Sequence, residues 1–534
     1  MMRIGIAKRR FRRMRRLRSP FYKLLAIAAV IVCFVYWVAV IACARPVHQG
    51  DREIYYAAGD EFLTAGFYGL EDYWNNIAKT QTYLVRGHLD NYLPIALKSL
   101  NYKPADATMR LLAEAFFAPR HPQTGLIPFS YNTRPYSNLP NSYSPQLRHF
   151  QTEGKQPVAL IGRAIDFCQW FPNDLTLQNR CVALAKATLQ YFDFRTPSGE
   201  RGGMWGWVNV ANGGEPRGAI TLIQDYGEVA KGLAYLSART GDPQFLQWAD
   251  QKLQFVWQNR MNPNLPLLPE LLIPSQALNR PEEPSSDTDT LYYVRQLFDL
   301  YQMTGNTRYR DWAMAVTRLW FEQAWNPQWG HFVRKLTPLG TPAVSELYGD
   351  GKYNTLHILV RAYQVTQDEQ YLQRLKVAWS NLVKMGSEGL VPERIDRGIG
   401  DRAGGLDRQQ TIFLSILVDA YRVSGDRVFL QEAESLGRRI LQRGKAVMRA
   451  EGGQAGEAFL QLAIARQKIG RLEVAIARRG TQLRIERGNQ QILEVSVPSE
   501  VAVIYLPEGT YQVTANNHGS IQKKVLHLEG QMHF

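Results

Sequence analysis

The sequence predicts a mainly α-helical chain of repeated helical hairpins, preceded by a transmembrane helix and followed by a small β domain. Three observations support this fold class. A sequence pattern that predicts the end of one helix, a tight turn and the start of a second helix occurs four times between Gly232 and Ala433. The 21 residues Leu24–Ala44 contain no charged side chain. After Lys468, apolar and polar residues alternate with a period of two, which is typical of β-strands.

The four copies of this pattern align on a hydroxyl residue at the end of the first helix. The aligned residues of successive copies are 64, 62 and 58 positions apart. Glycine comes next in three copies, where a left-handed residue ends a helix. Each copy then has an Asp or Asn that suits a helix N-cap. An aromatic residue three positions later gives the second helix an inward stripe. We therefore assign structural roles to the hydroxyl residues Thr240, Thr304, Thr366 and Ser424, to Gly241, Gly305 and Gly425, to the caps Asp242, Asn306, Asp368 and Asp426, and to the aromatics Phe245, Tyr309, Tyr371 and Phe429.

Fainter hairpins precede these four, at Tyr73–Phe117 and Ile161–Phe192, and a late helix is predicted at Ala455–Lys468. The repeat is longer than the roughly 34–47 residues of most helical solenoids. Long connections such as Thr124–Asn132 and Glu388–Asp396 separate the hairpins. About six hairpins with long connections favour a closed toroid over an open superhelix.

This organisation, from roughly Glu53 to Lys468, resembles the six-hairpin (α/α)6-barrel glycosidase superfamily. The resemblance rests on the hairpin count, the short "TGD" turns and the "TGL-P" loops, and no signature of a single family is present. It implies an (α/α)6 toroid and an activity on carbohydrates. Glycoside hydrolases, unsaturated uronyl hydrolases, polysaccharide lyases and sugar epimerases share this architecture, and a fold alone does not choose among them.

In such a toroid the inner helices start at one rim and run to the short turns at the other. Counting 15 residues back from the aligned hydroxyl residues reaches Asp225, Asp289, Gly351 and Gln409. Fifteen helical residues span roughly 22 Å, so these segments should share the rim opposite the short turns. They combine acids, tyrosines and bases, which suits sugar hydroxyls and ring faces. Each acid also fits an ordinary helix N-cap, and that alternative stays open.

We predict a carbohydrate site at this rim. Glycoside hydrolysis needs one protonated and one ionised carboxyl group on either side of the scissile bond, and crowded acids push their pKa values apart. The catalytic candidates are Asp289 and Asp225, with Glu346, Asp350 and Asp407 as competitors. The candidates for substrate binding are Trp205, Trp207, Tyr226, Tyr292, Tyr348, Lys352, Arg408 and His149. The two tryptophans lie in a glycine-rich loop, and packing of that loop is their alternative role.

The leading functional hypothesis is a membrane-tethered, extracytoplasmic carbohydrate-active enzyme, a glycoside hydrolase acting on a polysaccharide or oligosaccharide. In a uronate lyase or epimerase, a Tyr or His would instead take the C5 proton while Arg or Lys neutralises the carboxylate. A non-catalytic glycan-binding or polysaccharide-assembly protein on the same fold is the alternative from another class. No metal-ligand spacing is visible, so no metal or other cofactor is expected. The oligomeric state stays open.

The N-terminal charge pattern predicts a membrane anchor. Residues 1–23 contain ten Lys and Arg residues and no acid, and removing these ten bases lowers the net charge from +15 to 15 − 10 = +5. The body of the chain therefore does not have the charge of a nucleic-acid-binding protein. Residues 1–23 are expected to be a basic cytoplasmic segment, residues 24–44 to span the membrane, and the rest to lie outside the cytoplasm. A lipid-anchored Cys43 and a cleaved signal peptide are the alternatives.

Two regions complete the prediction. Cys168 and Cys181 lie 13 residues apart across a predicted hairpin, which is compatible with a disulfide but does not require one. Residues 53–470 should form the toroid, and residues 471–534 a small β domain. Capping or packing is the simplest role for the β domain, and glycan binding is the alternative.

Overall fold

The structure is a computed structural model. It describes residues 45–80, 94–118, 120–127, 155–158, 160–195, 201–210, 213–218, 221–273, 276–277, 286–344, 347–348, 350–395, 409–444 and 453–533. The chain divides into two compact units: Phe62–Gln467, which is largely helical, and Met1–Glu61 together with Lys468–Phe534, which is largely β. The second stretch of the β unit begins at Lys468, and residues 53–57 form a strand of the same unit.

Five helical hairpins follow one another in the helical unit. Each consists of two helices in contact, joined by a short turn. Their bounds are α6 (Leu160–Trp170) with α7 (Leu175–Tyr191), α8 (Ile223–Thr240) with α9 (Pro243–Gln258), α10 (Thr290–Thr304) with α11 (Thr307–Gln323), α12 (Asp350–Thr366) with α13 (Glu369–Met385), and α14 (Gln410–Ser424) with α15 (Arg427–Gln442). The first helices of the last four pairs start within two residues of the positions counted back from the turns.

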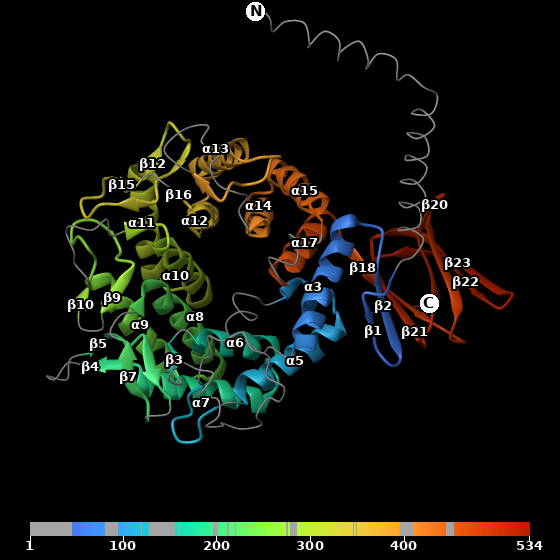
Figure 1. Ribbon diagram of the computed structural model, residues 1–534, viewed down its shortest axis with the longest axis horizontal. Helices are drawn as coiled ribbons and strands as arrows, with labels where there is room; N and C mark the ends of the chain where they lie inside the picture. Colours follow the sequence, from blue (N-terminus) through green and yellow to red (C-terminus); the bar gives the residue numbers. More distant parts are fainter. Residues whose placement is uncertain are drawn as a thin grey trace, which may run out of the picture. The chain divides into compact units, whose positions relative to one another are not determined.

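The hairpins form a closed ring (Figure 1). The first helix of each pair contacts that of the next, from α6 through α8, α10 and α12 to α14. Helix α17 (Gly453–Arg466) contacts α14 on one side and α4 (Ile95–Ser99) on the other, and α5 (Lys103–Phe117) contacts α6. Helix α3 (Glu61–Thr80) lies against α17, since a Cβ on Gly456 would be 2.9 Å from the Gly66 carbonyl oxygen. The structure thus has the closed toroid that the sequence predicted.

The short turns follow the predicted chemistry. Gly241, Gly305 and Gly425 have φ between 71° and 73°, in the left-handed region. The side chains of Asp242, Asn306, Asp368 and Asp426 each accept a hydrogen bond from the backbone two residues later. The aligned hydroxyl residue has a further role at every turn: the Thr304 hydroxyl donates to the Leu300 carbonyl at 2.7 Å and accepts from the Asn306 amide at 3.2 Å. This residue therefore links the end of one helix to the cap of the next.

Short strands lie in the connections between hairpins. β3 (Lys155–Pro157), β6 (Trp207–Asn209) and β7 (Glu215–Gly218) form one sheet, and β4 (Asp193–Arg195) pairs with β5 (Arg201–Met204). Two more three-stranded sheets consist of β8 (Thr221–Leu222), β9 (Leu271–Ile273) and β10 (Gln276–Ala277), and of β11 (Ser286–Asp287), β14 (Lys335–Leu336) and β15 (Pro342–Val344). Two further strand pairs are β12 (Trp325–Asn326) with β13 (His331–Phe332), and β16 (Leu347–Tyr348) with β17 (Arg394–Ile395).

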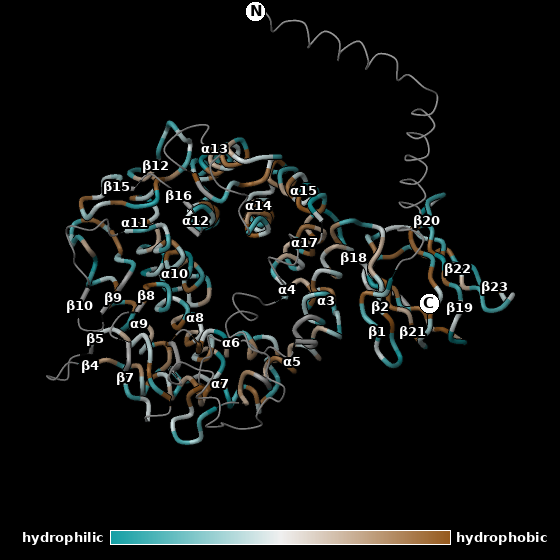
Figure 2. Tube along the Cα trace, viewed as in Figure 1, coloured by the Kyte–Doolittle hydropathy of each residue, from teal (hydrophilic) through white to brown (hydrophobic). Residues whose placement is uncertain are grey.

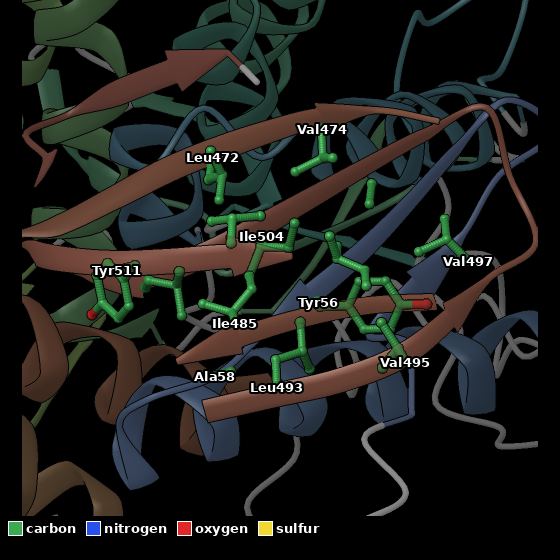
Figure 3. Packing of buried hydrophobic residues seen from close by; sticks show 14 of the residues in the cluster. Tyr56, Ala58, Leu472, Val474, Ile485, Leu493, Val495, Val497, Ile504 and Tyr511 are labelled. Atoms are coloured by element: carbon green, nitrogen blue, oxygen red, sulfur yellow. The ribbon is translucent and has the colours of Figure 1, made fainter. Parts of the chain in front are cut away.

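The β unit consists of two sheets. One has the order β1 (His48–Gln49), β2 (Glu53–Ala57), β21 (Val501–Pro507), β18 (Ile469–Ala475) and β24 (Gln531–His533). The other has the order β20 (Gln490–Val497), β19 (Thr481–Arg487), β22 (Gly509–Asn517) and β23 (Ser520–Leu528). Side chains of both sheets, such as Leu472 and Leu493, share one buried cluster (Figure 3). Strand β2 runs parallel to β21, a pairing between chain ends that local patterns do not reveal.

Two further expectations concern the disulfide and the membrane. Cys168 and Cys181 are joined by a disulfide, with their Cα atoms 6.8 Å apart. The predicted anchor, residues 24–44, lies outside the described residues. Within the residues that are described, no helix has both the length and the apolar character needed to span a bilayer.

Candidate active site

The first helices of the hairpins carry charged side chains that interact with one another across the ring. The aligned turns place these side chains in layers. Nine residues before the turn hydroxyl stand Lys231, Arg295, His357 and Ser415, and five residues before it stand Tyr235, Asp299, Arg361 and Asp419. A spacing of four residues keeps both layers on one face of each helix. Figure 2 shows hydrophilic and hydrophobic residues alternating along these helices, as expected for helices with one charged and one packed face.

Solvent reaches this charged face. The side chain of Asp166 on α6 is 36% exposed, that of Lys231 on α8 is 33% exposed, and that of Asp299 on α10 is 18% exposed. The opposite faces of the same helices are buried in the core, for example at Leu233 and Leu297. The charged residues therefore line a solvent-accessible inner surface of the ring.

Asp166 and Glu228 form a carboxyl pair on the neighbouring helices α6 and α8. The two helices approach closely at Gly162, where a Cβ would lie 3.3 Å from Glu228 Oε2. Asp166 is one turn further along the same face of α6, about 6 Å from Gly162. The charge of Glu228 acts on Asp166, so the two carboxyl groups are neighbours across the contact between α6 and α8. Glycoside hydrolysis uses a carboxyl pair of this kind.

The surroundings drive the pKa values of this pair apart. Burial raises the pKa of Asp166 to about 6, and the nearby Glu228 carboxylate adds to the rise against the opposing charges of Arg163 and Lys231. Burial would also raise the pKa of Glu228, but Lys231, Arg163 and a hydrogen bond from the Tyr292 hydroxyl outweigh it and lower the pKa. At a pH just below 6, Asp166 is protonated while Glu228 is ionised. This is the division between acid and base that paired carboxyl groups use in catalysis.

The neighbouring charges are arranged as ion pairs. Lys231 Nζ donates to Asp299 Oδ2 at 2.8 Å, and Arg361 lies 3.5 Å from the other oxygen of Asp299. Burial opposes ionisation of Asp299, but these two cations outweigh it and lower its pKa. On α14, burial raises the pKa of Asp419 although Arg422 lies 3.7 Å away. One charge network thus extends from α6 to α14.

Glu457 links the last helix of the ring to the first. Its Oε1 accepts hydrogen bonds from the Ala96 amide of α4 and from Gln461 Nε2, both at 2.9 Å. Burial raises the pKa of Glu457 to about 7. This carboxyl group is therefore partly protonated at neutral pH, and it joins α17 to the start of α4.

The two leading catalytic candidates lie at the rim, one turn above the carboxyl pair. Asp225 is half-buried in the first turn of α8, three residues before Glu228. Asp289 is half-buried at the N-cap position of α10, but its side chain makes no capping hydrogen bond. Its backbone amide donates to Asp287 Oδ1 at 3.2 Å. Asp287 itself is buried between Arg334 and Lys335, at 3.2 and 3.1 Å, so this acid has a structural role.

Two predicted substrate-binding residues have structural roles instead. Tyr226 is 1% exposed, and its hydroxyl accepts a hydrogen bond from the Met204 amide at 3.0 Å. Lys352 is fully buried, and its Nζ donates to the carbonyl oxygens of Pro392, at 2.8 Å, and Glu393. Because their polar atoms serve the backbone and their side chains are buried, we correct both assignments.

The remaining candidates are placed as follows. Tyr292 belongs to the inner surface, where its hydroxyl donates to Glu228. Trp205 is half-buried edge-to-face on Phe194, with ring centroids 5.2 Å apart, and Trp207 is half-buried in β6. Asp350 begins α12, and Tyr348 pairs with Arg394 between β16 and β17. His149, Glu346, Asp407 and Arg408 lie outside the described residues.

Sequence reasoning stopped one turn short of the carboxyl pair. Glu228 lies three residues after Asp225, the residue that the count of 15 positions reached. The aligned repeats contained the missing signal, because positions nine and five before each turn are polar in nearly every copy. Asp166 was harder to find, since its hairpin has Pro172 where the other copies have a hydroxyl residue.

A separate cleft of about 700 Å³ lies at the short-turn end of the ring. It is lined by residues between Lys98 and Arg110 and between Trp170 and Asp174. Lys98 Nζ donates to the Trp170 carbonyl at 2.8 Å, and the Trp170 indole donates to Asp106 at 2.8 Å. These groups bond one another across adjacent hairpins, so we assign the cleft no chemistry. Among the described residues, no cluster of three His, Cys, Asp or Glu side chains suits a metal ion.

The fold and inner surface define a class of protein, a toroid of helical hairpins with a charged solvent-accessible interior. No family model matches the chain, and no curated protein matches it in sequence. Solved structures resemble it in fold. Cellobiose 2-epimerase from Spirochaeta thermophila is 13% identical, with a TM-score of 0.49 over 69% of this chain and 99% of that one.

Two further solved structures show the same likeness. D-mannose isomerase is 12% identical, with a TM-score of 0.48 over 64% of this chain and 86% of that one. Unsaturated glucuronyl hydrolase from Streptococcus agalactiae is 12% identical, with a TM-score of 0.41 over 73% and 95%. At these identities and scores, the likeness does not indicate what this chain binds or does.

Proposed function

We propose that the chain is a carbohydrate-active enzyme that hydrolyses a glycosidic bond of a polysaccharide or oligosaccharide. The observation that carries the proposal is the Asp166–Glu228 pair, in which neighbouring carboxyl groups on a solvent-accessible surface have pKa values shifted in opposite directions. The pair replaces Asp225 and Asp289 as the reacting groups. Those two residues stay at the rim, where we assign them to substrate contact.

The mechanism assigns one step to each carboxyl group. Asp166 gives its proton to the glycosidic oxygen as the bond to the leaving sugar breaks. The ionised Glu228 either attacks the anomeric carbon or takes a proton from the attacking water. The hydrogen bond from Tyr292 holds Glu228 in place and in its ionised form. Glu228 lies five residues inside the start of α8, about 8 Å from the rim, so the substrate must enter the ring.

The test is hydrolysis by the piece that begins at residue 50. The soluble protein is incubated with a panel of polysaccharides, and new reducing ends and 232-nm absorbance are followed. Asp166→Asn and Glu228→Gln should each lower the rate of reducing-end release at least 100-fold. Asp311→Asn is the matched control, because Asp311 is exposed on the outer helix α11 and pairs only with Arg310. Unchanged rates in the Asp166 and Glu228 variants would refute the assignment.

A second enzymatic candidate has one observation in its favour. His357 on α12 is held neutral, because burial and the charges of Arg295 and Arg361 lower its pKa well below the usual value. The imidazole is therefore unprotonated at neutral pH, as the base of a lyase or an epimerase must be, although its lowered pKa makes it a weak base. Unsaturated products absorbing at 232 nm, without dependence on Asp166, would indicate this reaction. Binding without any product would indicate the glycan-binding alternative.

We also propose that residues 24–44 tether the protein to a membrane, with its main part outside the cytoplasm. The Cys168–Cys181 disulfide supports this location, because disulfides persist in oxidising compartments. The test fuses alkaline phosphatase, which is active only outside the cytoplasm, to the C-terminus. Activity that disappears when residues 24–44 are removed supports the tether, and activity of a fluorescent cytoplasmic reporter at the same position would refute it. A Cys43→Ala variant that leaves the membrane separates the lipid-anchored form from the spanning form.

A further inference from the structure

Arg295 differs from the other cations of the inner surface. Arg163 lies 3.8 Å from Asp166, Lys231 and Arg361 share Asp299, and Arg422 lies 3.7 Å from Asp419. Within the part of the chain that the structure describes, the Arg295 guanidinium has no ion pair within 4 Å and no hydrogen bond. Its charge acts at longer range on Glu228, Asp299 and Asp419. Because no carboxylate among the described residues bonds its N–H groups, they are open to a negatively charged ligand.

The guanidinium is held in a fixed orientation. Its carbon lies 4.4 Å from the centroid of the Tyr292 ring, a contact that stabilises a cation on an aromatic face. The Tyr292 hydroxyl is bonded to Glu228, so the ring that supports Arg295 is itself anchored beside the carboxyl pair. An arginine placed over an aromatic ring can still use its N–H groups for bidentate bonds to a carboxylate.

His357 stands beside Arg295 in the same layer. Both residues lie nine positions before their turn hydroxyl, on the neighbouring helices α10 and α12. His357 is half-buried, and no hydrogen bond to its imidazole is found among the described residues. An unpaired arginine and a neutral imidazole therefore face the same interior. Together they offer one positive charge and additional hydrogen-bonding capacity.

We propose that the substrate is an acidic glycan, and that the carboxylate of a uronic acid residue binds to Arg295 next to Asp166 and Glu228. This inference rests on the proposed function, which it extends to a substrate class. The single positive charge of Arg295 matches the single negative charge of a carboxylate. Two N–H groups of its planar guanidinium match the two carboxylate oxygens. The ionised Glu228 and Asp299 in the same network would oppose a more highly charged group.

The experiment compares acidic and neutral forms of the same sugars. Oligosaccharides of galacturonate, mannuronate and glucuronate are each paired with their carboxyl-reduced counterparts. Calorimetry gives the affinities for an Asp166→Asn protein, which cannot turn the ligand over. Arg295→Gln is introduced in that background, with Arg295→Lys as the charge-preserving variant. Arg422→Gln is the matched control, because it removes the same charge from a paired arginine on the same inner surface. Thermal unfolding confirms that each variant is folded.

We expect at least one uronate ligand to bind about 10-fold or more tightly than its reduced counterpart. Arg295→Gln should weaken uronate binding about 10- to 100-fold and change neutral binding less than 3-fold, and Arg295→Lys should recover part of the loss. The inference is overturned if no uronate binds more tightly than its neutral form, or if Arg422→Gln weakens binding as much as Arg295→Gln. Arg295-dependent uronate binding without hydrolysis would refute only the proposed function. Hydrolysis of neutral glycans alone would refute only this inference.

Discussion

Replacing Tyr292 by phenylalanine tests the reasoning about the carboxyl pair most directly. The change removes one oxygen and leaves the ring under Arg295. It deletes the hydrogen bond to Glu228, one of the contacts that favour the ionised carboxylate. The Coulombic contributions of Lys231, Arg163 and Arg295 remain. The pKa of Glu228 should therefore rise, while the fold and the cation–π contact persist.

The magnitude follows from the kind of bond. A hydrogen bond to a charged group contributes about 1.5–3 kcal/mol, and 1.36 kcal/mol corresponds to one pKa unit. The expected rise is thus about 1–2 units. Because the pKa of Glu228 is lowered in the folded protein, its ionised form stabilises the fold above the ordinary glutamate pKa of about 4.3. That stability is lost as the pH falls, and the variant should lose about 1.5–3 kcal/mol of it at neutral pH.

Two measurements check this prediction. Carbon-13 NMR of the glutamate carboxyl groups reports the pKa of Glu228 without any assay of activity. In the pH–rate profile, the acid limb of kcat/KM should move upward by the same amount. Tyr235→Phe is the matched control, because its hydroxyl donates to the backbone carbonyl of Cys168 at 3.1 Å and not to a carboxylate. An unchanged Glu228 titration in Tyr292→Phe, or an equal shift in Tyr235→Phe, would show that the bond does not set this pKa.

Three further outcomes follow from single contacts. Activity should fall as the pH rises through about 6, where Asp166 loses its proton, and a kcat/KM profile that stays flat to about pH 8 would contradict its role as the acid. Replacing Cys168 and Cys181 together by serine should lower the free energy of unfolding by about 3 kcal/mol, measured by urea denaturation under oxidising conditions; an unchanged midpoint would argue against the disulfide. Lys252→Met should cost about 1–3 kcal/mol, because Lys252 Nζ lies 2.5 Å from the buried Asp193 carboxylate, which then keeps the more exposed Arg195, 3.0 Å away, as a cationic partner. That loss should shrink at about pH 4, near the ordinary aspartate pKa, where Asp193 can take up a proton, and a loss independent of pH would exclude the lost ion pair as its cause.

The hairpins were predictable because their signals are local. The glycine that ends a helix and the Asp or Asn that caps the next act on backbone groups within a few residues. The Asp242 side chain, for example, accepts from the Gln244 amide. The hydroxyl at the turn was used only to align the copies, although Thr304 bonds both helices. Even this role was readable in principle, because both of its partners are near in sequence.

The proposed carboxyl pair was less predictable because its properties depend on distant residues. Asp166 and Glu228 stand 62 positions apart, and their contact depends on the close approach of two helices at Gly162. Each residue along a helix also turns its side chain by about 100°. An error of one turn or one position therefore exchanges a rim residue for an interior residue. Tyr226 and Lys352 illustrate this, since both belong to the packed side of the ring wall.

The sequence by itself determined the helices, their turns and caps, and their order. It also determined the helix length, which separates the two opposite rims of the ring. It could do so because hydrogen bonds and apolar stripes within a helix involve neighbouring residues. Only the tertiary structure decided which acids meet, which of them holds a proton and which arginine lacks a partner. Charge interactions and desolvation depend on the distances between helices, and closure of the ring sets those distances.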